Sequence, residues 1–501
     1  MSEKDKKSKK AADRLVEIAS DCGLFHAPDG TPFASLDING HRENWPVRSK
    51  GFKQWLAREY YTRDGTAAAS DAVQTALTII EGKARFDGAQ ALPYIRAGGD
   101  ARRIYIDLCD RDWRAVEIDA EGWRIIEGSP VKFRRAAGMK ALPAPVRGLG
   151  GLERLQPFLN LENPDDFVLI KAWLVQAVRP DGPFPILAFV GEQGAAKSTA
   201  SKVMKSIIDP NAAALRTFPR DERDLYIAAC NGHVLAFDNV SRVSPWLSDA
   251  LCRLATGGGF ATRQLHTDTD EILFDAQRPI ICNGIGDFLD RADAADRAIL
   301  IKLAAIPEDR RRTERDIWNE FNAALPAILA GLYDAVSEGL AALPHVQLDR
   351  VPRMADFAAW AVACEAAHSD EGAFMKAYAG NRDEAVYAIA DSDEVASGVI
   401  AHMATFHEWT GTATELFHTL WESADESTRR GSGFPKSAKA LSERLTRAAP
   451  VLRKVGIDVH RDKASDRART RKILLTNNRN KVESASAPSG ASYPSLSSEE
   501  F

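Results

Sequence analysis

The chain has 501 residues, a formal net charge of −5 and a hydrophobic content of 45%. This length is too great for one hydrophobic core, so we expect about three domains of roughly 150 residues each. The small negative net charge excludes a uniformly basic nucleic-acid-binding chain, so any surface for nucleic acid must be a local patch.

The N-terminus, the cysteines and the apolar runs favour a cytoplasmic protein. The lysine-rich start, MSEKDKKSKK, is not followed by the apolar segment of a signal peptide. No apolar run approaches the length of about 18 residues that a membrane-spanning helix needs, so no membrane partner is expected. The six cysteines form no C-x-x-C pair and no zinc-type cluster, which is typical of reduced thiols in the cytosol.

The first part of the chain predicts a disordered basic lead over residues 1–10 and an α+β accessory domain over 11–150. Helical periodicity covers 11–22, 49–61 and 70–80, APDGTP predicts a hairpin turn, and period-two patterning over 93–133 predicts an antiparallel meander. Within the meander, DLCDRD supplies Asp107, Asp110 and Asp112. They are either ligands of a metal-dependent polymerase site or ordinary strand and turn residues, and their place in the meander favours the second.

Residues 151–345 predict an α/β core built on a parallel sheet. The apolar strand FPILAFV is followed by a glycine-rich loop and a helix from Lys197, and HVLAFDN and PIICN are two further strands. A helix is expected from Ser244, and residues 313–340 are mostly helical with a break at Pro326.

Residues 346–475 predict a helical and basic winged-helix-like domain. Helical patterns in TATELFHTLWE and PKSAKALSERLTRAAPVLRKVG are followed by the strand-like IDVHR and RKILLT. Residues 476–501 are rich in serine, asparagine and alanine, which predicts a disordered tail.

The segment GEQGAAKST has the spacing of a phosphate-binding loop, in which backbone N–H groups and a lysine hold phosphates and a hydroxyl holds Mg²⁺. It predicts ATP and Mg²⁺ as cofactors; the alternative is a glycine-rich turn without a ligand. Ala196 stands where such loops usually carry glycine, and we expect a negative φ there, at which alanine costs little. The predicted nucleotide contacts are Gly191, Glu192, Gln193, Gly194, Ala195, Ala196, Lys197, Ser198 and Thr199.

Four residues farther along the chain are candidates for the chemistry of hydrolysis. Asp238, at a strand end, would join Ser198 in holding Mg²⁺, and Asn239 follows where a glutamate is wanted to polarise water. An amide can orient water but cannot accept its proton. Asn283 would orient the attacking water, and Arg297, or Arg291, would reach a neighbouring subunit's phosphate. The alternatives are turn residues for the aspartate and asparagines and surface ion pairs for the arginines.

The order of these motifs resembles the superfamily 3 helicases of the AAA+ ATPases, and more closely the helicase part of phage, plasmid and poxvirus-type primase–helicases. The resemblance rests on GEQGAAKST, VLAFDNV, LATGGGFATRQLHTDTDEILFDAQRPIICNGI and DRADAADRAI, within residues 155–345. It implies a P-loop AAA+ core, a homo-oligomer that is a hexamer with ATP between subunits, and a hairpin directed at DNA that carries Arg263 and His266. Ala196, Asn239 and the acidic turn HTDTDE depart from the family pattern.

The C-terminal domain carries the clearest basic patch. From Arg429 to Lys472 there are 14 Lys and Arg against 4 Asp and Glu, a net charge of +10. A basic helix–helix–hairpin unit predicts binding to single-stranded or duplex DNA, whereas the alternative is a solvated face or a docking surface for an acidic neighbour. The predicted contacts are Lys436, Lys439 and Arg447 on the second helix and Arg469 and Arg471 on the hairpin.

The sequence therefore predicts an ATP-dependent DNA helicase or translocase that acts in the replication of a phage, plasmid or other mobile element. Asn239 keeps open a slow ATP-gated loader or initiator. A phosphotransferase for a small molecule is the second alternative, against which the basic C-terminal domain and the TGGG hairpin segment argue.

Overall fold

The chain is a mixed α/β protein with several sheets that divides into two compact units. Unit 1 comprises residues 1–288 and 296–381, and unit 2 comprises 289–295 and 382–501. The computed structural model describes residues 3–148, 150–240, 243–258, 260–263, 271–274, 277–284, 292–431, 433–463 and 471–478. No helix among these residues is long and apolar enough to cross a membrane.

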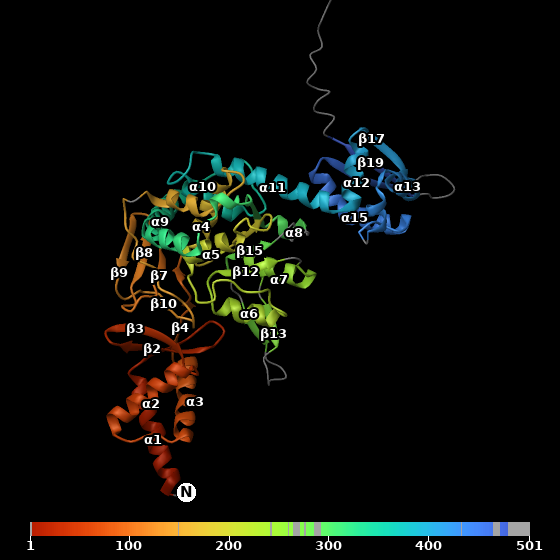
Figure 1. The fold of residues 1–501 in the computed structure, drawn as a ribbon. Coiled ribbons are helices and arrows are strands. Elements are labelled where there is room, and N and C mark those ends of the chain that lie inside the picture. Colours follow the sequence, from red (N-terminus) through yellow and green to blue (C-terminus); the bar gives the residue numbers. More distant parts are fainter. Residues whose placement is uncertain are drawn as a thin grey trace, which may run out of the picture. The chain divides into compact units, whose positions relative to one another are not determined.

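The first part of unit 1 is a small helical bundle beside a four-stranded sheet (Figure 1). Its elements are α1 (Glu3–Ser20), β1 (Gly23–His26), β2 (Pro32–Ile38), β3 (His41–Pro46), α2 (Lys50–Asp64), α3 (Ser70–Phe86) and β4 (Ala89–Gln90). The predicted helices and the hairpin at APDGTP are confirmed. The predicted disorder of residues 1–10 is wrong in part, because α1 begins at Glu3 and continues into a buried face with Leu15 and Ile18.

An antiparallel meander follows, as predicted, with the strand order β6-β7-β8-β9. Its strands and the neighbouring two-stranded sheet are β5 (Pro93–Tyr94), β6 (Ala97–Gly99), β7 (Ile104–Asp107), β8 (Ala115–Asp119), β9 (Gly122–Ile126) and β10 (Lys132–Phe133). Asp107 pairs with Arg135, and Asp110 pairs with Arg114. No group of three acidic, histidine or cysteine side chains in the described part of the chain is arranged to hold a metal, so the polymerase-site alternative gains no support.

The centre of unit 1 is a four-stranded parallel sheet in the order β12-β15-β11-β16. The strands are β11 (Ile186–Val190), β12 (Leu235–Val240), β15 (Ile280–Gly284) and β16 (Ala298–Lys302). The first three were predicted; β16 was missed, because a five-residue apolar run after a charged helical pattern carries little signal of its own. All carboxyl ends lie at one edge, where the glycine-rich loop also lies.

Helices enclose this sheet, and the longest of them, α9, runs without a break through Pro326. The predicted break there is wrong because buried Leu325, Ile328 and Leu329 hold the helix in the core.

The remaining elements are η1 (Gly151–Phe158), α4 (Asp166–Ala177), α5 (Lys197–Ile208), α6 (Glu222–Cys230), α7 (Pro245–Thr256), β13 (Phe260–Arg263), β14 (Glu271–Phe274), α8 (Ala292–Ala295), η2 (Glu308–Arg310), α9 (Glu314–Ala342), η3 (Leu343–His345) and α10 (Ala355–Glu365).

The predicted domain boundary at residue 346 is wrong. Phe357 and Trp360 of α10 are fully buried in the core of unit 1, and the Trp360 indole N–H donates to the carbonyl of Val175 in α4. The following helix, α11 (Ala373–Ser392), begins in unit 1, where Asn381 closes two hydrogen bonds with the backbone of Leu300 in β16. The boundary therefore lies next to Asn381.

Unit 2 contains the predicted helix–helix–hairpin arrangement together with two elements that the sequence did not reveal, β17 and α14. Its elements are α12 (Glu394–Met403), β17 (Glu408–Thr412), α13 (Ala413–Ser423), α14 (Glu426–Arg430), α15 (Ala438–Lys454), β18 (Ile457–Lys463) and β19 (Arg471–Asn477). The antiparallel sheet has the order β17-β19-β18. The helical spacing of α15 predicts a buried stripe of Ala440, Leu441, Leu445, Ala448 and Leu452. All of these but Ala440, which is only half-buried, lie on the buried face together with Val451.

Candidate nucleotide-binding site and basic surface

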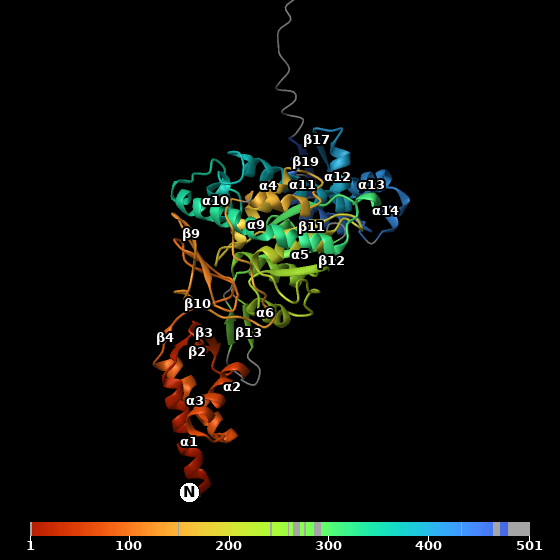
Figure 2. The same cartoon turned by 60° about the vertical axis from the view of Figure 1, so that its left-hand side comes forward.

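The loop between β11 and α5 has a backbone that requires glycine at two positions. Gly191 has a φ of 154°, and a Cβ at this residue would lie 2.6 Å from the carbonyl oxygen of Leu303. Gly194 has a φ of 89°, in the region that side chains disfavour. The loop leads directly into the N-terminus of α5, whose free backbone N–H groups attract anions. Figure 2 shows α5 beside β11 and β12.

Ala196 adopts the left-handed conformation, with φ 59° and ψ 29°. The prediction of a negative φ is therefore wrong. It treated Ala196 as the first helical residue, whereas α5 begins one residue later and Ala196 is its N-cap. An L-residue with a Cβ is disfavoured in this conformation by about 1–2 kcal/mol, so alanine strains the loop where glycine would not.

Lys197 lies across the mouth of the loop. Its ammonium group donates hydrogen bonds to the carbonyl oxygens of Gly191 at 2.7 Å and Glu192 at 2.6 Å. Desolvation lowers the pKa of Lys197, and the nearby charge of Asp238 opposes this effect in part. The ammonium is thus held among loop carbonyls close to an N-terminus that attracts anions, as the predicted phosphate contact requires.

Ser198 and Asp238 are brought together from segments that are 40 residues apart in the chain. The Ser198 hydroxyl donates to Asp238 Oδ1 at 2.8 Å. Both groups supply oxygen atoms, the ligand type that Mg²⁺ prefers. The donor set is of the type that fits a magnesium ion held by one carboxylate, one hydroxyl and non-protein oxygens, and the binding of Mg²⁺ by this pair stays a prediction.

Asn283 connects β15 to the neighbouring strand β12 and to the helix α5. It is buried, its Oδ1 accepts a hydrogen bond from the Asn239 backbone N–H at 3.1 Å, and its Nδ2 donates to Ser201 Oγ in α5 at 2.8 Å. Both ends of the amide are therefore engaged with protein groups. The oxygen can accept a second hydrogen bond and the nitrogen can donate a second one, so the role of Asn283 in orienting water stays a prediction. The exposed Asn239, with a φ of 55°, stands at the strand end beside Asp238.

Arg297 lies at the edge of the sheet opposite the loop. It directly precedes β16, and its carbonyl oxygen accepts from the N–H of Ile186, the first residue of β11. A five-residue strand is about 16 Å long, so Arg297 is separated from the loop of its own chain by roughly the length of the sheet. The predicted role of Arg297 at a neighbouring subunit's phosphates stays a prediction. Arg291 lies outside the described residues.

Arg311 is a cation beside the loop that sequence reasoning missed. Its Nη2 lies 4.0 Å from the position that a Cβ of Gly194 would take. Its side chain is 60% exposed, and its ion pair with Glu308 is long, at 3.7 Å. The run Arg310–Arg312 was a visible signal, but nothing in its spacing connected it with the loop. Glu222, the first residue of α6, pairs with Arg253 at 2.9 Å.

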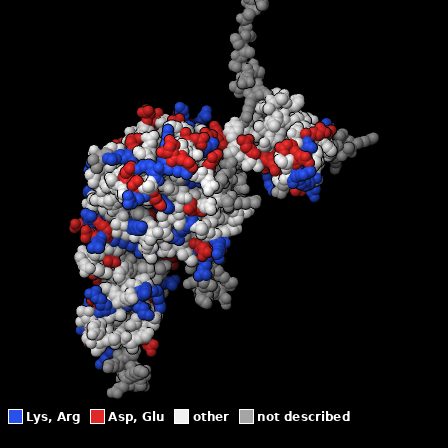
Figure 3. All heavy atoms as spheres, viewed as in Figure 1, with Lys and Arg blue, Asp and Glu red and all other residues white. Residues whose placement is uncertain are grey.

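The predicted basic contacts of unit 2 separate into engaged and exposed groups. Lys436 precedes α15 instead of lying on it, and its ammonium donates to the carbonyl oxygens of Arg429 and Gly431 at 2.6 and 3.0 Å. Lys439 and Arg447 are exposed on α15, away from the buried face. Figure 3 shows basic and acidic groups adjacent to one another on the visible face of this unit.

Four predicted DNA contacts are only partly covered by the structure. Arg263 ends β13, where its backbone pairs with Glu271 of β14, and Arg471 begins β19. Only the backbone of these two arginines is described. His266 and Arg469 lie outside the described residues.

In comparisons with known proteins, two regions of the chain match models of protein families. Residues 152–385 match the model of the actinomycete integrative conjugative element replication protein, and residues 395–489 match the model of the C-terminal domain of the RepA protein of these elements. No curated protein matches the chain. Solved structures of the NrS-1 C-terminal region are similar in part.

The A form apo structure of that region is 12% identical, with a TM-score of 0.38, and the match covers 92% of this chain and 98% of that chain. The apo structure of NrS-1 residues 305–718 is 11% identical, with a TM-score of 0.37, over 93% of this chain and 98% of that chain. Over these two matched regions the chain is similar to the replication protein of actinomycete integrative conjugative elements and to the C-terminal domain of their RepA protein.

Proposed function

We propose that the chain is an ATP-driven DNA helicase or translocase of superfamily 3 type that serves the replication of an integrative element. The observation that carries this proposal is the 2.8 Å contact between Ser198 and Asp238, at the N-terminus of a helix that follows a glycine-requiring loop. A hydroxyl and a carboxylate at this point would hold Mg²⁺ beside phosphates that the loop receives. The match to replication-protein models supports DNA as the substrate.

In the proposed site, the chain's own groups bind and orient the nucleotide. The N–H groups of the loop and of α5 surround phosphate oxygens, while Lys197 moves from the carbonyl oxygens of Gly191 and Glu192 to the phosphates. Arg311 approaches from the side of Gly194 as a second cation of the same chain. Bound Mg²⁺ would neutralise charge on the phosphate oxygens. Asn239 can hold a water through its amide but cannot remove a proton from it.

The position of Arg297 supports an oligomer in which each site is completed by a neighbour. Since this arginine lies at the far edge of its own sheet, we propose that it acts on the next subunit's phosphates within a homohexamer. Arg297→Ala is expected to preserve ATP binding and to lower hydrolysis by about 10³-fold or more. Mixing Arg297→Ala with Lys197→Ala subunits should restore activity at the interfaces that combine an intact loop with an intact arginine. A monomer that hydrolyses ATP normally would contradict this arrangement.

A slow ATP-gated loader or initiator is the second candidate, and the exposed amide of Asn239 beside Asp238 favours it. Steady-state ATP hydrolysis by the full chain, measured with and without single-stranded DNA, distinguishes the two. Strong stimulation together with strand displacement supports a motor. A slow rate that DNA does not change, together with ATP-dependent DNA retention, supports the loader. Turnover that depends on a small phosphate acceptor would contradict both.

A further inference from the structure

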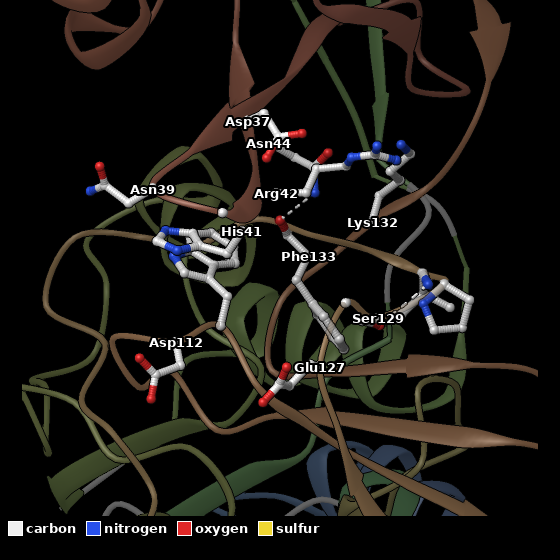
Figure 4. A pocket seen from close by; sticks show the side chains of 15 residues that line it. Asp37, Asn39, His41, Arg42, Asn44, Asp112, Glu127, Ser129, Lys132 and Phe133 are labelled. Carbon is white, nitrogen blue, oxygen red and sulfur yellow. Dashed lines mark hydrogen bonds between the residues drawn. The ribbon is translucent and has the colours of Figure 1, made fainter.

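A second polar cavity lies in the N-terminal part of unit 1, outside the residues that the family models match. Its volume is about 640 Å³, which is within the range of small-molecule binding sites. The walls are the β2–β3 hairpin, the turn that carries Asp112 and Trp113, and the segment from Glu127 to Phe133 (Figure 4). The cavity is therefore built from segments that are some 90 residues apart in the chain.

Two cations, Arg42 and Lys132, lie at one end of this cavity, which Asp37, the cross-strand neighbour of Arg42, also lines. Arg42 is close enough to Lys132 for its charge to lower the pKa of the lysine, and desolvation lowers this pKa more strongly. Figure 4 shows the two side chains beside one another. Neither one forms an ion pair with a carboxylate in the described part of the chain. Because two adjacent like charges repel each other, their placement is stabilised when an anion binds between them.

A buried hydrogen-bond relay holds Lys132 in this place. Its ammonium donates to Ser35 Oγ at 3.0 Å, the Ser35 hydroxyl donates to Asn44 Oδ1 at 2.5 Å, and Asn44 Nδ2 donates to the Phe133 carbonyl oxygen at 3.0 Å. Ser35 and Asn44 are both buried. Lys132 has three N–H donors and the relay uses one, so the ammonium is fixed in position with donors left for a ligand.

Planar groups form the other end of the cavity. The rings of His41 and Trp113 are stacked with centroids 6.0 Å apart, and the Arg135 guanidinium lies 3.7 Å from the Trp113 ring centroid. Arg135 is in turn held by both carboxylate oxygens of Asp107, at 2.9 and 2.7 Å. Trp113 has a φ of 54°, a conformation that bulky residues rarely adopt and that often marks functional sites.

We propose that this cavity binds one nucleotide, with its phosphate on Arg42 and Lys132 and its base beside the His41–Trp113 pair. Cations for the phosphate and planar side chains for the base are the combination with which proteins hold single nucleotides of a strand. Asp112 lies at the aromatic end, where its charge repels a phosphate and its oxygens accept hydrogen bonds from a base or a sugar. The ligand is therefore oriented by charge at both ends.

Photo-crosslinking to the full chain tests the proposal, because it reports the position of the ligand. The chain carries Lys197→Ala so that the loop of α5 does not compete. One probe is 8-azido-dAMP, and the other is a single-stranded hexanucleotide that contains 5-iodo-deoxyuridine. Mass spectrometry should locate the crosslink within residues 39–44 or 110–133. Crosslinking by 8-azido-dAMP identifies a free nucleotide as the ligand, whereas crosslinking by the hexanucleotide alone identifies a nucleotide within a strand.

The variants Arg42→Ala and Lys132→Ala should each reduce crosslinking at this site by about 10-fold or more, as expected for the loss of a charged hydrogen bond. Arg42→Lys should restore part of it. The matched control is Arg58→Ala, an exposed arginine on α2 that does not line the cavity. If Lys132→Ala lowers the thermal unfolding midpoint, Arg42→Ala alone decides, since Arg42 is exposed on a hairpin. The absence of crosslinks in both segments, or crosslinks that Arg42→Ala leaves unchanged, would overturn the proposal.

Discussion

The loop of unit 1 and the basic face of unit 2 were both predicted from residue patterns. In the structure, the predicted residues of the loop lie close together, whereas several cations of the basic face form hydrogen bonds or ion pairs within their own unit. In unit 1, Lys197, Ser198 and Asp238 meet at one edge of the parallel sheet. In unit 2, many cations that raised the local charge bind the unit's own groups. Lys436 holds two backbone carbonyl oxygens, Arg461 donates to the carbonyl oxygen of Ser442, and Arg430 pairs with Glu426.

The difference between the two regions shows which kind of sequence pattern predicts that side chains lie close together in the fold. Strand, loop and helix in a parallel sheet bring the carboxyl ends of strands to one edge, so the spacing along the chain determines proximity. A charge count has no such geometry. Of the three cations predicted around α15, only Lys439 and Arg447 make no hydrogen bond or ion pair with another described residue, and Arg447 lines a hollow of about 230 Å³ beside Glu394.

The largest expected effect concerns the loop. Lys197→Ala should lower ATP hydrolysis by about 10³-fold or more, because the cation at the mouth of the loop is lost where charge develops. Lys202→Ala on the same helix is the control: its exposed pair with Glu314 at 3.2 Å contributes at most about 1 kcal/mol to stability. Equal rates of ATP hydrolysis in both variants would show that Lys197 does not contribute to the site.

The second largest expected effect is at Asn239, and it distinguishes an ATP-driven motor from a slow ATP-gated loader or initiator. Asn239→Asp should raise kcat by roughly 10²-fold with little change in ATP affinity, because a carboxylate can accept the proton of water. Aspartate tolerates the positive φ of this position. Asn239→Gln retains the amide and should give no increase. If Asn239→Asp is slower than the parent in single-turnover hydrolysis, another group already acts as the base.

The third expected effect shows which cations of unit 2 contact DNA. In a salt titration of DNA binding, Lys439→Gln and Arg447→Gln should each reduce the log–log slope by about 0.9 on duplex DNA, or about 0.7 on a single strand. Lys436→Gln should leave the slope unchanged and lower the free energy of unfolding by about 1 kcal/mol, since it removes internal hydrogen bonds. A slope change for Lys436→Gln alone would reverse our distinction between engaged and exposed cations. Substitutions suit this test better than truncation after Gly380, which would remove the Asn381 contacts with β16.

The smallest effect is at Ala196. Because its φ is positive, Ala196→Gly should increase the free energy of unfolding by up to about 1 kcal/mol and should not weaken ATP binding. Ala195→Gly is the matched control: Ala195 is buried and has no positive φ, so glycine there should destabilise. Equal destabilisation by both substitutions, measured by urea unfolding, would show that Ala196 is not strained.

The sequence by itself determined the parallel-sheet core, the loop with Lys197 and Ser198, and the buried stripe of α15. Each of these follows from local periodicity or from spacing along the chain. The sequence also indicated replication of a mobile element, which the family models support over two regions.

Only the tertiary structure decided the conformation of Ala196, the approach of Arg311 to Gly194 and the two engaged ends of the Asn283 amide. It likewise decided that α10 belongs to unit 1 and that Arg42 and Lys132 share one cavity. The physical reason is common to all of them. Backbone strain, hydrogen-bond partners and charge neighbours depend on segments that are distant in the chain, and no local pattern records which of those segments will pack together.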